Sequence, residues 1–385
     1  MYNIVKVVKY MILAKKVRLK PTKEQEIQLW KSVGTARWTY NWTLNRQQEN
    51  HTKGNKFISD GDLRKEITRL KKQEEFKWLN DVSNNVAKQA VKDACDAFKK
   101  FFKGQSKFPK FKSRKKSYPS FYHDTEKLKV GKGYVQLEKI GQVLTSEQLP
   151  MGVKYMNPRI TFDKKYWYIA VGIEQEQPKQ ELTDTVVGVD LGIKELAVCS
   201  DGQVFKNINK TKAVRKTEKR LRRLQRKVSR KYEMNKEGKS FVKTSNIIKI
   251  EKQIQRLHRR LTNIRTNHIH QATTKVVKTK PCKVVMEDLN ISGMMKNRHL
   301  AKAVANQKLY EFIRQMKYKC EKYGIAFLQV DRFYPSSKTC SSCGKIKKDL
   351  KLSDRTYKCE CGNKMDRDLN AAINLANYGK LSVSH

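Results

Sequence analysis

Acidic residues are scarce in this sequence of 385 residues, which has 37 Asp and Glu against 84 Lys and Arg. The formal net charge is therefore +47, far more than solubility requires. Charge of this size favours a polyanionic partner, and nucleic acid is the usual one because each neutralised phosphate releases counterions. The alternative is a solvated basic surface without a partner. We expect a protein that binds nucleic acid.

Long apolar runs are also missing. The uncharged run at residues 10–14 lies between Lys9 and Lys15, so it is too short for the core of a signal peptide or for a membrane-spanning helix. A membrane is therefore not the expected polyanion, and we expect an intracellular protein. In a reducing compartment, the eight cysteines are expected to be metal ligands or buried apolar residues rather than disulfides.

The residue pattern changes along the first half of the chain. Residues 21–107 are expected to be mainly helical, because apolar side chains recur at helical spacing after a helix start at Pro21. Residues 108–176 contain short alternating runs broken by glycines, which is typical of antiparallel β-structure. The polar segment 174–184 is the best linker in the chain. We place the main domain boundary there.

Residues 185–189 and 195–199 are predicted to be two strands that pair in an antiparallel hairpin, and a long basic stretch follows them. Its apolar residues keep a seven-residue repeat over 214–228 and again over 250–264, which predicts two helices that form an antiparallel hairpin. The cations between them indicate either a nucleic-acid track or a solvated helix face, and the pattern favours neither. The candidate nucleic-acid contacts in this stretch are Arg222, Arg223 and Arg226.

Three acidic residues lie where phosphodiester chemistry would need them. Asp190 ends one predicted buried strand, and the glycines that flank it would let the backbone turn close to a ligand. Glu287 ends another buried strand, and Asp368 lies at the expected start of a helix. Carboxylates at adjacent strand ends suit Mg²⁺, and two such ions about 3.5–4 Å apart can stabilise both oxygens of an in-line displacement. Taken singly, each acid is more typical of a turn or a helix cap. Asp366 is the rival for the third position.

Two tight cysteine pairs, Cys340 with Cys343 and Cys359 with Cys361, are separated by a hairpin-sized segment. This spacing favours a structural Zn²⁺ site with four thiolate ligands. A glycine follows each pair, as in zinc-knuckle turns, although the second pair has the less common spacing. Four buried thiols without metal are the alternative. The other cysteines have apolar neighbours and are expected in the core: Cys95, Cys199, Cys282 and Cys320.

The string His268-Ile-His270 matches the metal-binding histidines of single-strand transposases, which are a different class of enzyme. That role requires a strand, on which both side chains would point the same way. Here the string continues the helical repeat, and residues two apart on a helix do not face each other. We expect both histidines to be ordinary helix residues.

Several motifs occur in the order found in the TnpB (OrfB) proteins of insertion sequences. They are Val17-Arg-Leu-Lys-Pro-Thr22, Gly34 with Arg37 and Tyr40-Asn41, Phe108-Pro-Lys-Phe-Lys112, Gly188-Val-Asp-Leu-Gly192, Val284-Val-Met-Glu-Asp-Leu289, the cysteine pairs, and Asp366-Arg-Asp-Leu-Asn-Ala-Ala372. The sequence resembles that family over most of its length. It is also similar to the type V CRISPR effectors, with which the family shares a RuvC-like nuclease.

The resemblance implies a fold of the α/β plus α+β class. It has an RNase H-like (RuvC) nuclease domain with a zinc-ribbon insertion, preceded by an oligonucleotide-binding β-barrel that a helical recognition domain splits. The implied domains are a wedge-like barrel at 1–20 and 108–180, the helical domain at 21–107, the nuclease at 184–336 and 364–380, and the ribbon at 337–363.

The resemblance further implies that Asp190, Glu287 and Asp368 are the catalytic triad that binds two Mg²⁺ ions. Asp368 is preferred to Asp366 because the Asp-x-Asn-Ala pattern recurs in the type V enzymes. Three residues match family positions in the N-terminal half and are expected to contact nucleic acid: Arg37, Lys110 and Lys112.

The implied activity is RNA-guided cleavage of double-stranded DNA next to a short transposon-adjacent motif. The guide RNA would come from the transposon end, and we expect a monomer in the cytoplasm of a bacterium or archaeon, associated with the nucleoid. One alternative is a nuclease-inactive guided repressor, which would have lost one of the three acids. The other is an unguided RuvC-like structure-specific nuclease, which would not need the long segment before Asp190.

Overall fold

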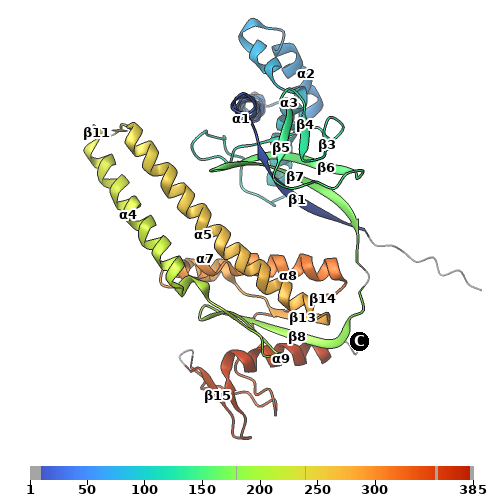
Figure 1. Cartoon of the computed structure of the whole chain (residues 1–385), viewed down its shortest axis with the longest axis vertical. Coiled ribbons are helices and arrows are strands. Elements are labelled where there is room, and N and C mark those ends of the chain that lie inside the picture. Colours follow the sequence, from blue (N-terminus) through green and yellow to red (C-terminus); the bar gives the residue numbers. More distant parts are fainter. Residues whose placement is uncertain (1–9, 179, 239, 352–353, 382–385) are drawn as a thin grey trace, which may run out of the picture. The chain divides into compact units, whose positions relative to one another are not determined.

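The computed structural model describes residues 10–178, 180–238, 240–351 and 354–381 (Figure 1). The chain divides into two compact units, Met1–Glu176 and Gln177–His385. Residues 1–9 of the expected barrel and residues 352–353 of the expected ribbon lie outside the described part. Among the described helices, none is both long enough and apolar enough to cross a membrane.

The first unit contains a seven-stranded antiparallel sheet and a group of helices. Its strands are β1 (Tyr10–Lys20), β2 (Ser120–Tyr122), β3 (Lys129–Gly131), β4 (Tyr134–Leu137), β5 (Gly141–Thr145), β6 (Tyr155–Asp163) and β7 (Tyr166–Glu176). Its helices are α1 (Lys23–Thr52), α2 (Asp60–Leu70), the 3-10 helix η1 (Glu74–Asp81) and α3 (Asn84–Phe102). The strand order is β2-β6-β7-β1-β5-β4-β3, so β1 lies at the centre and the helices are inserted between β1 and β2 along the chain.

Helix α1 begins where the sequence predicted a helix start. The Thr22 hydroxyl accepts a hydrogen bond from the Gln25 amide, and the Gln25 side chain accepts one from the Thr22 amide. This capping box satisfies two amide groups that the first helical turn leaves without partners. One face of α1 then packs on the sheet, where Leu29 and Val33 share a buried core with Val17.

The second unit contains a five-stranded mixed sheet of order β10-β9-β8-β13-β14. Its strands are β8 (Thr183–Leu191), β9 (Glu195–Cys199), β10 (Val204–Lys206), β13 (Pro281–Glu287) and β14 (Ala326–Val330), with two small hairpins formed by β11 (Lys236–Glu237) and β12 (Ser240–Phe241) and by β15 (Thr356–Lys358) and β16 (Lys364–Asp366). Its helices are η2 (Ile208–Lys210), α4 (Lys212–Met234), α5 (Ser245–Lys278), α6 (Ile291–Lys296), α7 (Ala301–Gln307), α8 (Leu309–Tyr323) and α9 (Arg367–Leu381). Strands β8 and β9 form the predicted antiparallel hairpin, whereas β13 pairs in parallel with both β8 and β14.

Helices cover both faces of this sheet (Figure 1). Alternate strand residues point to opposite faces. Val284 and Met286 belong to the core formed with α5 and α8, whereas Val285 packs with Leu375 of α9. The near-continuous apolar runs of β8 and β13 are those of strands that are buried on both faces.

The predicted helical hairpin is confirmed by α4 and α5, which β11 and β12 connect (Figure 1). Val214 and Leu221 of α4 are buried together with Leu257 and Leu261 of α5. The seven-residue repeat therefore marks the contact between the two helices, as in coiled coils.

Candidate active site and cysteine cluster

Two of the predicted acids lie side by side at the carboxyl ends of parallel strands. Val189 of β8 is in register with Met286 of β13, so Asp190 and Glu287 are the next residue of each strand. By strand alternation, Asp190 is on the same face as Gly188, and Glu287 is on the same face as Val285. Because this face is the one covered by α9, both carboxylates face the layer that carries Asp368.

The start of α9 separates the roles of Asp366 and Asp368. The Asp366 carboxylate accepts hydrogen bonds from the amides of Asp368 and Leu369, at 2.9 and 3.2 Å, and is exposed. It therefore acts as the N-cap of the helix. The Asp368 side chain is only 16% exposed, and one of its oxygens lies 3.4 Å from a guanidinium nitrogen of Arg367.

Gly188 sets the distance between β8 and α9. A Cβ atom at this position would lie 2.0 Å from the Ala372 carbonyl oxygen and 2.6 Å from the Ala376 amide nitrogen. We interpreted the glycines around Asp190 as allowing the backbone to approach a ligand. For Gly188 that interpretation is wrong, because the close neighbour is the backbone of α9. This approach holds the start of α9 against the strand that carries Asp190.

Replacing Gly188 with alanine is expected to displace α9 and to lower both stability and any activity that needs Asp368. Overpacking of this kind costs about 1–3 kcal/mol, and backbone atoms have little room to move away. The free energy of unfolding can be measured by urea denaturation, together with nuclease activity. Gly61→Ala is the matched control, because a Cβ there meets only the Ser59 hydroxyl at 3.6 Å. Equal stability of the two variants would contradict the close-packing argument.

The carboxylates also influence each other electrostatically. Burial raises the pKa of Asp190 well above its ordinary value, and the negative charges of Asp368 and Glu287 raise it further, while Arg367 opposes them. The pKa of Glu287 is raised by burial and by Asp288. A buried carboxylate whose pKa is raised by neighbouring negative charges stays ionised at neutral pH more easily when a cation lies beside it. Their hard oxygen donors are those that Mg²⁺ prefers.

The four predicted cysteine ligands form the tightest cluster. Within the part of the chain that the structure describes, only these residues place one ligand atom each within 4.8 Å of all the others. The acids around Asp190 do not reach that mutual spacing. The Sγ atoms of Cys340 and Cys361 are 3.6 Å apart, as are those of Cys343 and Cys359. A tetrahedral site with metal–sulfur bonds of about 2.3 Å requires separations near this value.

The turns after the cysteine pairs have the conformation that the sequence predicted. Gly344 and Gly362 have φ angles of 76° and 88°, in the left-handed region that glycine adopts without strain. The Gly344 amide donates to the Cys340 carbonyl, and the Gly362 amide donates to the Cys359 carbonyl. Each pair is therefore closed by a tight turn. The donor set and the spacing fit a thiolate metal site.

Two asparagines join the cysteine cluster to α9, a role that was not predicted from the sequence. Asn370 accepts a hydrogen bond from the Ser341 amide and donates one to the Thr339 carbonyl, at 3.0 and 2.7 Å. Asn374 donates to the carbonyls of Ser336 and Thr339. Both asparagines are buried, and this is unusual for a polar side chain. The Asp368-Leu-Asn-Ala-Ala372 motif contained the only sequence signal for this link.

The other residues singled out in the sequence are the predicted nucleic-acid contacts, the cysteines outside the cluster and the two histidines. In the first unit, Arg37 and Lys112 line one cavity, whereas Lys110 is exposed and is not part of that lining. Arg222, Arg223 and Arg226 are exposed on α4, a position that both interpretations of the basic helix allow. Three other cysteines are buried as expected, but the core position expected for Cys282 is wrong: it is only partly buried, at the start of β13 where the pairing with β8 is irregular. His268 and His270 lie on helix α5, as expected.

Three family models match the chain. The "Probable transposase" model of the OrfB type matches residues 168–298, and "Cas12f1-like, TNB domain" matches residues 310–375, which include the four clustered cysteines. A "Helix-turn-helix domain" model of the same OrfB type matches residues 11–56. In the structure, those residues form β1 and α1 rather than two short helices.

Proteins from two bacteria are similar to almost the whole chain. A "Putative RNA-guided DNA endonuclease" of Streptomyces pristinaespiralis is 32% identical over 94% of this chain and 88% of its own length. The "Putative RNA-guided DNA endonuclease InsQ" of Escherichia coli K12 is also 32% identical, over 94% of this chain and 91% of its own length. A Cas12f1 chain solved in complex with sgRNA and target DNA has a TM-score of 0.60 at 14% identity, covering 96% of this chain and 99% of that one, which indicates a shared fold.

Proposed function

Because the chain belongs to the TnpB (OrfB) family of insertion-sequence proteins, we propose that it is an RNA-guided DNA endonuclease with an RNase H-like (RuvC) active site. The observation that carries this proposal is the meeting of Asp190 and Glu287 at adjacent parallel strand ends, on the face covered by the helix of Asp368. In open α/β sheets, ligands bind outside the carboxyl ends of the strands.

Asp190, Glu287 and Asp368 would hold two divalent cations such as Mg²⁺. When bound, such ions activate water and stabilise the negative charge that develops at the scissile phosphate. The protein's contribution is to hold the three carboxylates in fixed positions. Asp190 and Glu287 are fixed by the register of β8 and β13, and Arg367 pairs with the Asp368 carboxylate. Asp366 is proposed as the helix cap and not as a ligand, because both of its hydrogen bonds go to backbone amides.

The four clustered cysteines are proposed to bind one structural Zn²⁺, since a closed thiolate site leaves no coordination position for substrate. Through Asn370 and Asn374, the ribbon around this ion would support α9 and so the position of Asp368. We also propose that the ribbon at 337–363 is inserted between the nuclease segments 184–336 and 364–380, with the barrel at 1–20 and 108–180 and the helical domain at 21–107.

The guide RNA is proposed to select the target by base pairing, while the protein recognises the heteroduplex by its shape and backbone and reads a short motif beside the target. The net charge of +47 supports two nucleic-acid partners. Relatives named as RNA-guided DNA endonucleases support the same assignment. The exposed arginines of α4 are proposed contacts in this role.

The function can be tested with protein expressed together with the flanking DNA of its own gene. RNA is expected to copurify, and a reprogrammed guide should direct double-strand cleavage of a plasmid that carries the matching target in Mg²⁺. Chelation with EDTA should stop cleavage. A scrambled guide is the control.

Each alternative function predicts a different result. A nuclease-inactive repressor would copurify with RNA and bind the matched plasmid without cutting it. An unguided nuclease would cut branched DNA without RNA and would ignore the guide sequence. Protein that carries no RNA and cleaves nothing would reject the proposal.

A further inference from the structure

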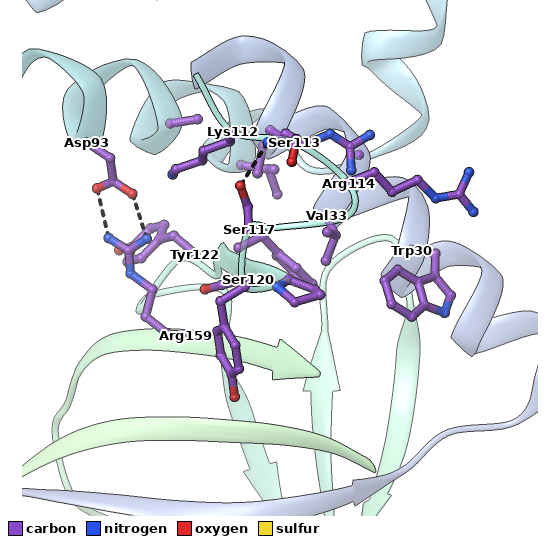
Figure 2. Close-up of a pocket in the computed structure, with 18 residues that line it drawn as sticks. Trp30, Val33, Asp93, Lys112, Ser113, Arg114, Ser117, Ser120, Tyr122 and Arg159 are labelled. Atoms are coloured by element: carbon purple, nitrogen blue, oxygen red, sulfur yellow. Dashed lines mark hydrogen bonds and ion pairs between the residues drawn. The ribbon is translucent and has the colours of Figure 1, made fainter. Parts of the chain in front are cut away.

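The first unit contains a cavity of about 300 Å³ that the proposed chemistry does not use (Figure 2). Helices α1 and α3, the segment that follows Lys112, and strands β2 and β6 enclose it. It is formed by residues of the first unit only. A cavity of this size is at the lower limit of pockets that hold small molecules, so it can take one nucleotide but not a duplex.

The cavity joins two motifs that are far apart in the sequence. The Asn41 side chain donates to the Lys112 carbonyl at 2.8 Å and accepts from the Lys112 amide at 2.7 Å. The Lys112 ammonium lies 3.6 Å from the centre of the Tyr40 ring. These contacts fix the segment around Lys112 against α1, where Gly34 and Arg37 line the same cavity.

An ion pair fixes one side of the cavity. Both guanidinium nitrogens of Arg159 donate to the Asp93 carboxylate, at 2.7 and 2.9 Å. Gln89 donates to the same carboxylate at 2.9 Å. The negative charge of Asp93 is therefore neutralised within the chain. The pair is held rigidly, because a bidentate contact fixes the guanidinium and carboxylate planes relative to each other.

The opposite side is open and aromatic. Figure 2 shows Trp30 and Arg114 across the cavity from the Asp93–Arg159 pair. The Trp30 side chain is 41% exposed, and Tyr118, which also lines the cavity, is 53% exposed. Between the two sides the lining is mixed: Val33 and Phe121 are buried, and Ser117 and Ser120 lie there as well (Figure 2). Exposed rings and apolar side chains match the faces of a nucleobase, and hydroxyl groups can bond to its polar edge.

Two cations of the lining are available to a phosphate. Arg37 is half-buried and Arg114 is exposed. Within the described residues, no carboxylate lies within ion-pair distance of either guanidinium. An arginine without an acidic partner, next to apolar side chains and exposed rings, suits a ligand with one flat apolar part and one anionic part. A nucleotide has both parts.

We propose that this cavity binds a single unpaired nucleotide, with its base between Trp30 and the apolar lining and its phosphate at Arg37 and Arg114. The base must be unpaired, because a base can enter a pocket only after it leaves the stack. The nucleotide belongs either to the guide RNA or to the target DNA. This inference rests on the proposed function, since that function supplies both nucleic acids.

Gly34 allows the cavity to be filled without other changes. A Cβ added there meets no atom within 4 Å, and leucine is a better helix former than glycine. Gly34→Leu should therefore fold normally and occupy the space of the base. Stacking of one base is worth about 5- to 150-fold in affinity, so a loss of that order is expected, with a smaller loss for Gly34→Ala.

Two binding measurements separate the possible sources of the nucleotide. In the first, apoprotein is titrated with the RNA that copurifies with the wild type. In the second, assembled protein–RNA complex is titrated with a matched target duplex. Weaker RNA binding by Gly34→Leu assigns the nucleotide to the guide, and weaker target binding alone assigns it to DNA. Unchanged affinity in both assays, with an unchanged melting temperature, overturns the proposal.

The phosphate contacts have their own test. Together, Arg37→Gln and Arg114→Gln should lower the log–log salt slope by about 0.7, because both arginines contact the same phosphate and this is the value for one phosphate of a single strand. Lys129→Gln is the matched control, because Lys129 is exposed on β3 and does not line the cavity. An equal slope for the Arg37→Gln/Arg114→Gln double variant and for Lys129→Gln rejects the phosphate site. If the wild-type complex cuts a matched target while Gly34→Leu binds both nucleic acids normally, the nucleotide site is rejected and the proposed function stands. Wild-type protein that binds no RNA rejects the proposed function as well.

Discussion

Asp190→Ala should lower guided DNA cleavage at least about a thousand-fold, because metal ions at such a site contribute several kcal/mol to stabilisation of the transition state. Glu287→Ala and Asp368→Ala should have effects of the same order. Affinity for guide RNA and for target DNA should change little, since phosphate contacts elsewhere supply most of it. Plasmid cleavage and binding are measured on the same preparations.

Stability distinguishes the loss of a ligand from misfolding. The pKa of Asp190 is raised in the folded protein, so without metal the unfolded chain ionises this carboxyl more readily and the fold loses stability as the pH rises above the ordinary pKa of an aspartate. At neutral pH, metal-free Asp190→Ala should therefore unfold at the same temperature as the wild type or at a higher one. A melting temperature well below the wild type would mean that Asp190 has a structural role instead.

Asp366→Asn is the matched control for the third acid. Asparagine is as good an N-cap as aspartate, so α9 should remain intact and cleavage should stay within a few-fold of the wild type. Asp368→Asn should be inactive. The reverse result, an inactive Asp366→Asn and an active Asp368→Asn, would exchange the two assignments. Full cleavage activity of Asp190→Ala would show that the active site does not lie at this end of the sheet.

The second large effect concerns the cysteine cluster. Cys340→Ser and Cys343→Ser should each lose most of the bound zinc, because coordination supplies about 10–16 kcal/mol of folding free energy in zinc-finger peptides. The ribbon should then become sensitive to protease. Cleavage of DNA should fall too, since Asn370 and Asn374 of α9 bind backbone groups next to Cys340. Zinc is measured by elemental analysis per mole of protein.

Cys282→Ser provides the comparison for these variants. Cys282 lies on β13, and its Sγ is 3.2 Å from the Thr185 carbonyl, a contact that a serine hydroxyl can also make. This variant should keep its zinc and its protease resistance. Unchanged zinc in both ribbon variants would show that the cluster is not the metal site. Loss of zinc in Cys282→Ser would indicate general misfolding.

Local features of the fold could be predicted because each depends on neighbouring residues. The start of α1 follows from the side chains of Thr22 and Gln25, which bond to each other's backbone within one turn. The α4–α5 hairpin follows from a repeat that places Leu221 and Leu257 on facing stripes. The cysteine cluster follows from two short spacings and the glycines after them. None of these needs knowledge of distant contacts.

The roles of Gly188, Asn370 and Asn41 could not be predicted in this way. Gly188 was interpreted from its neighbour Asp190, but its close contact is helix α9, which begins far along the chain. Asn370 bonds to the ribbon and Asn41 to the segment around Lys112. A side chain of each type has many possible partners. Only the folded backbone selects one of them.

The sequence by itself determined the family, the types of donor atom at both candidate metal sites and the large positive charge, because these depend on residue identity and short spacing. The tertiary structure decided which acids meet. Parallel pairing of β8 with β13, and the packing of α9 at Gly188, bring Asp190, Glu287 and Asp368 to one face from three distant segments. It also brought Arg37 and Lys112 to one cavity. Contacts of this kind depend on the register of strands and the approach of helices, which no local pattern specifies.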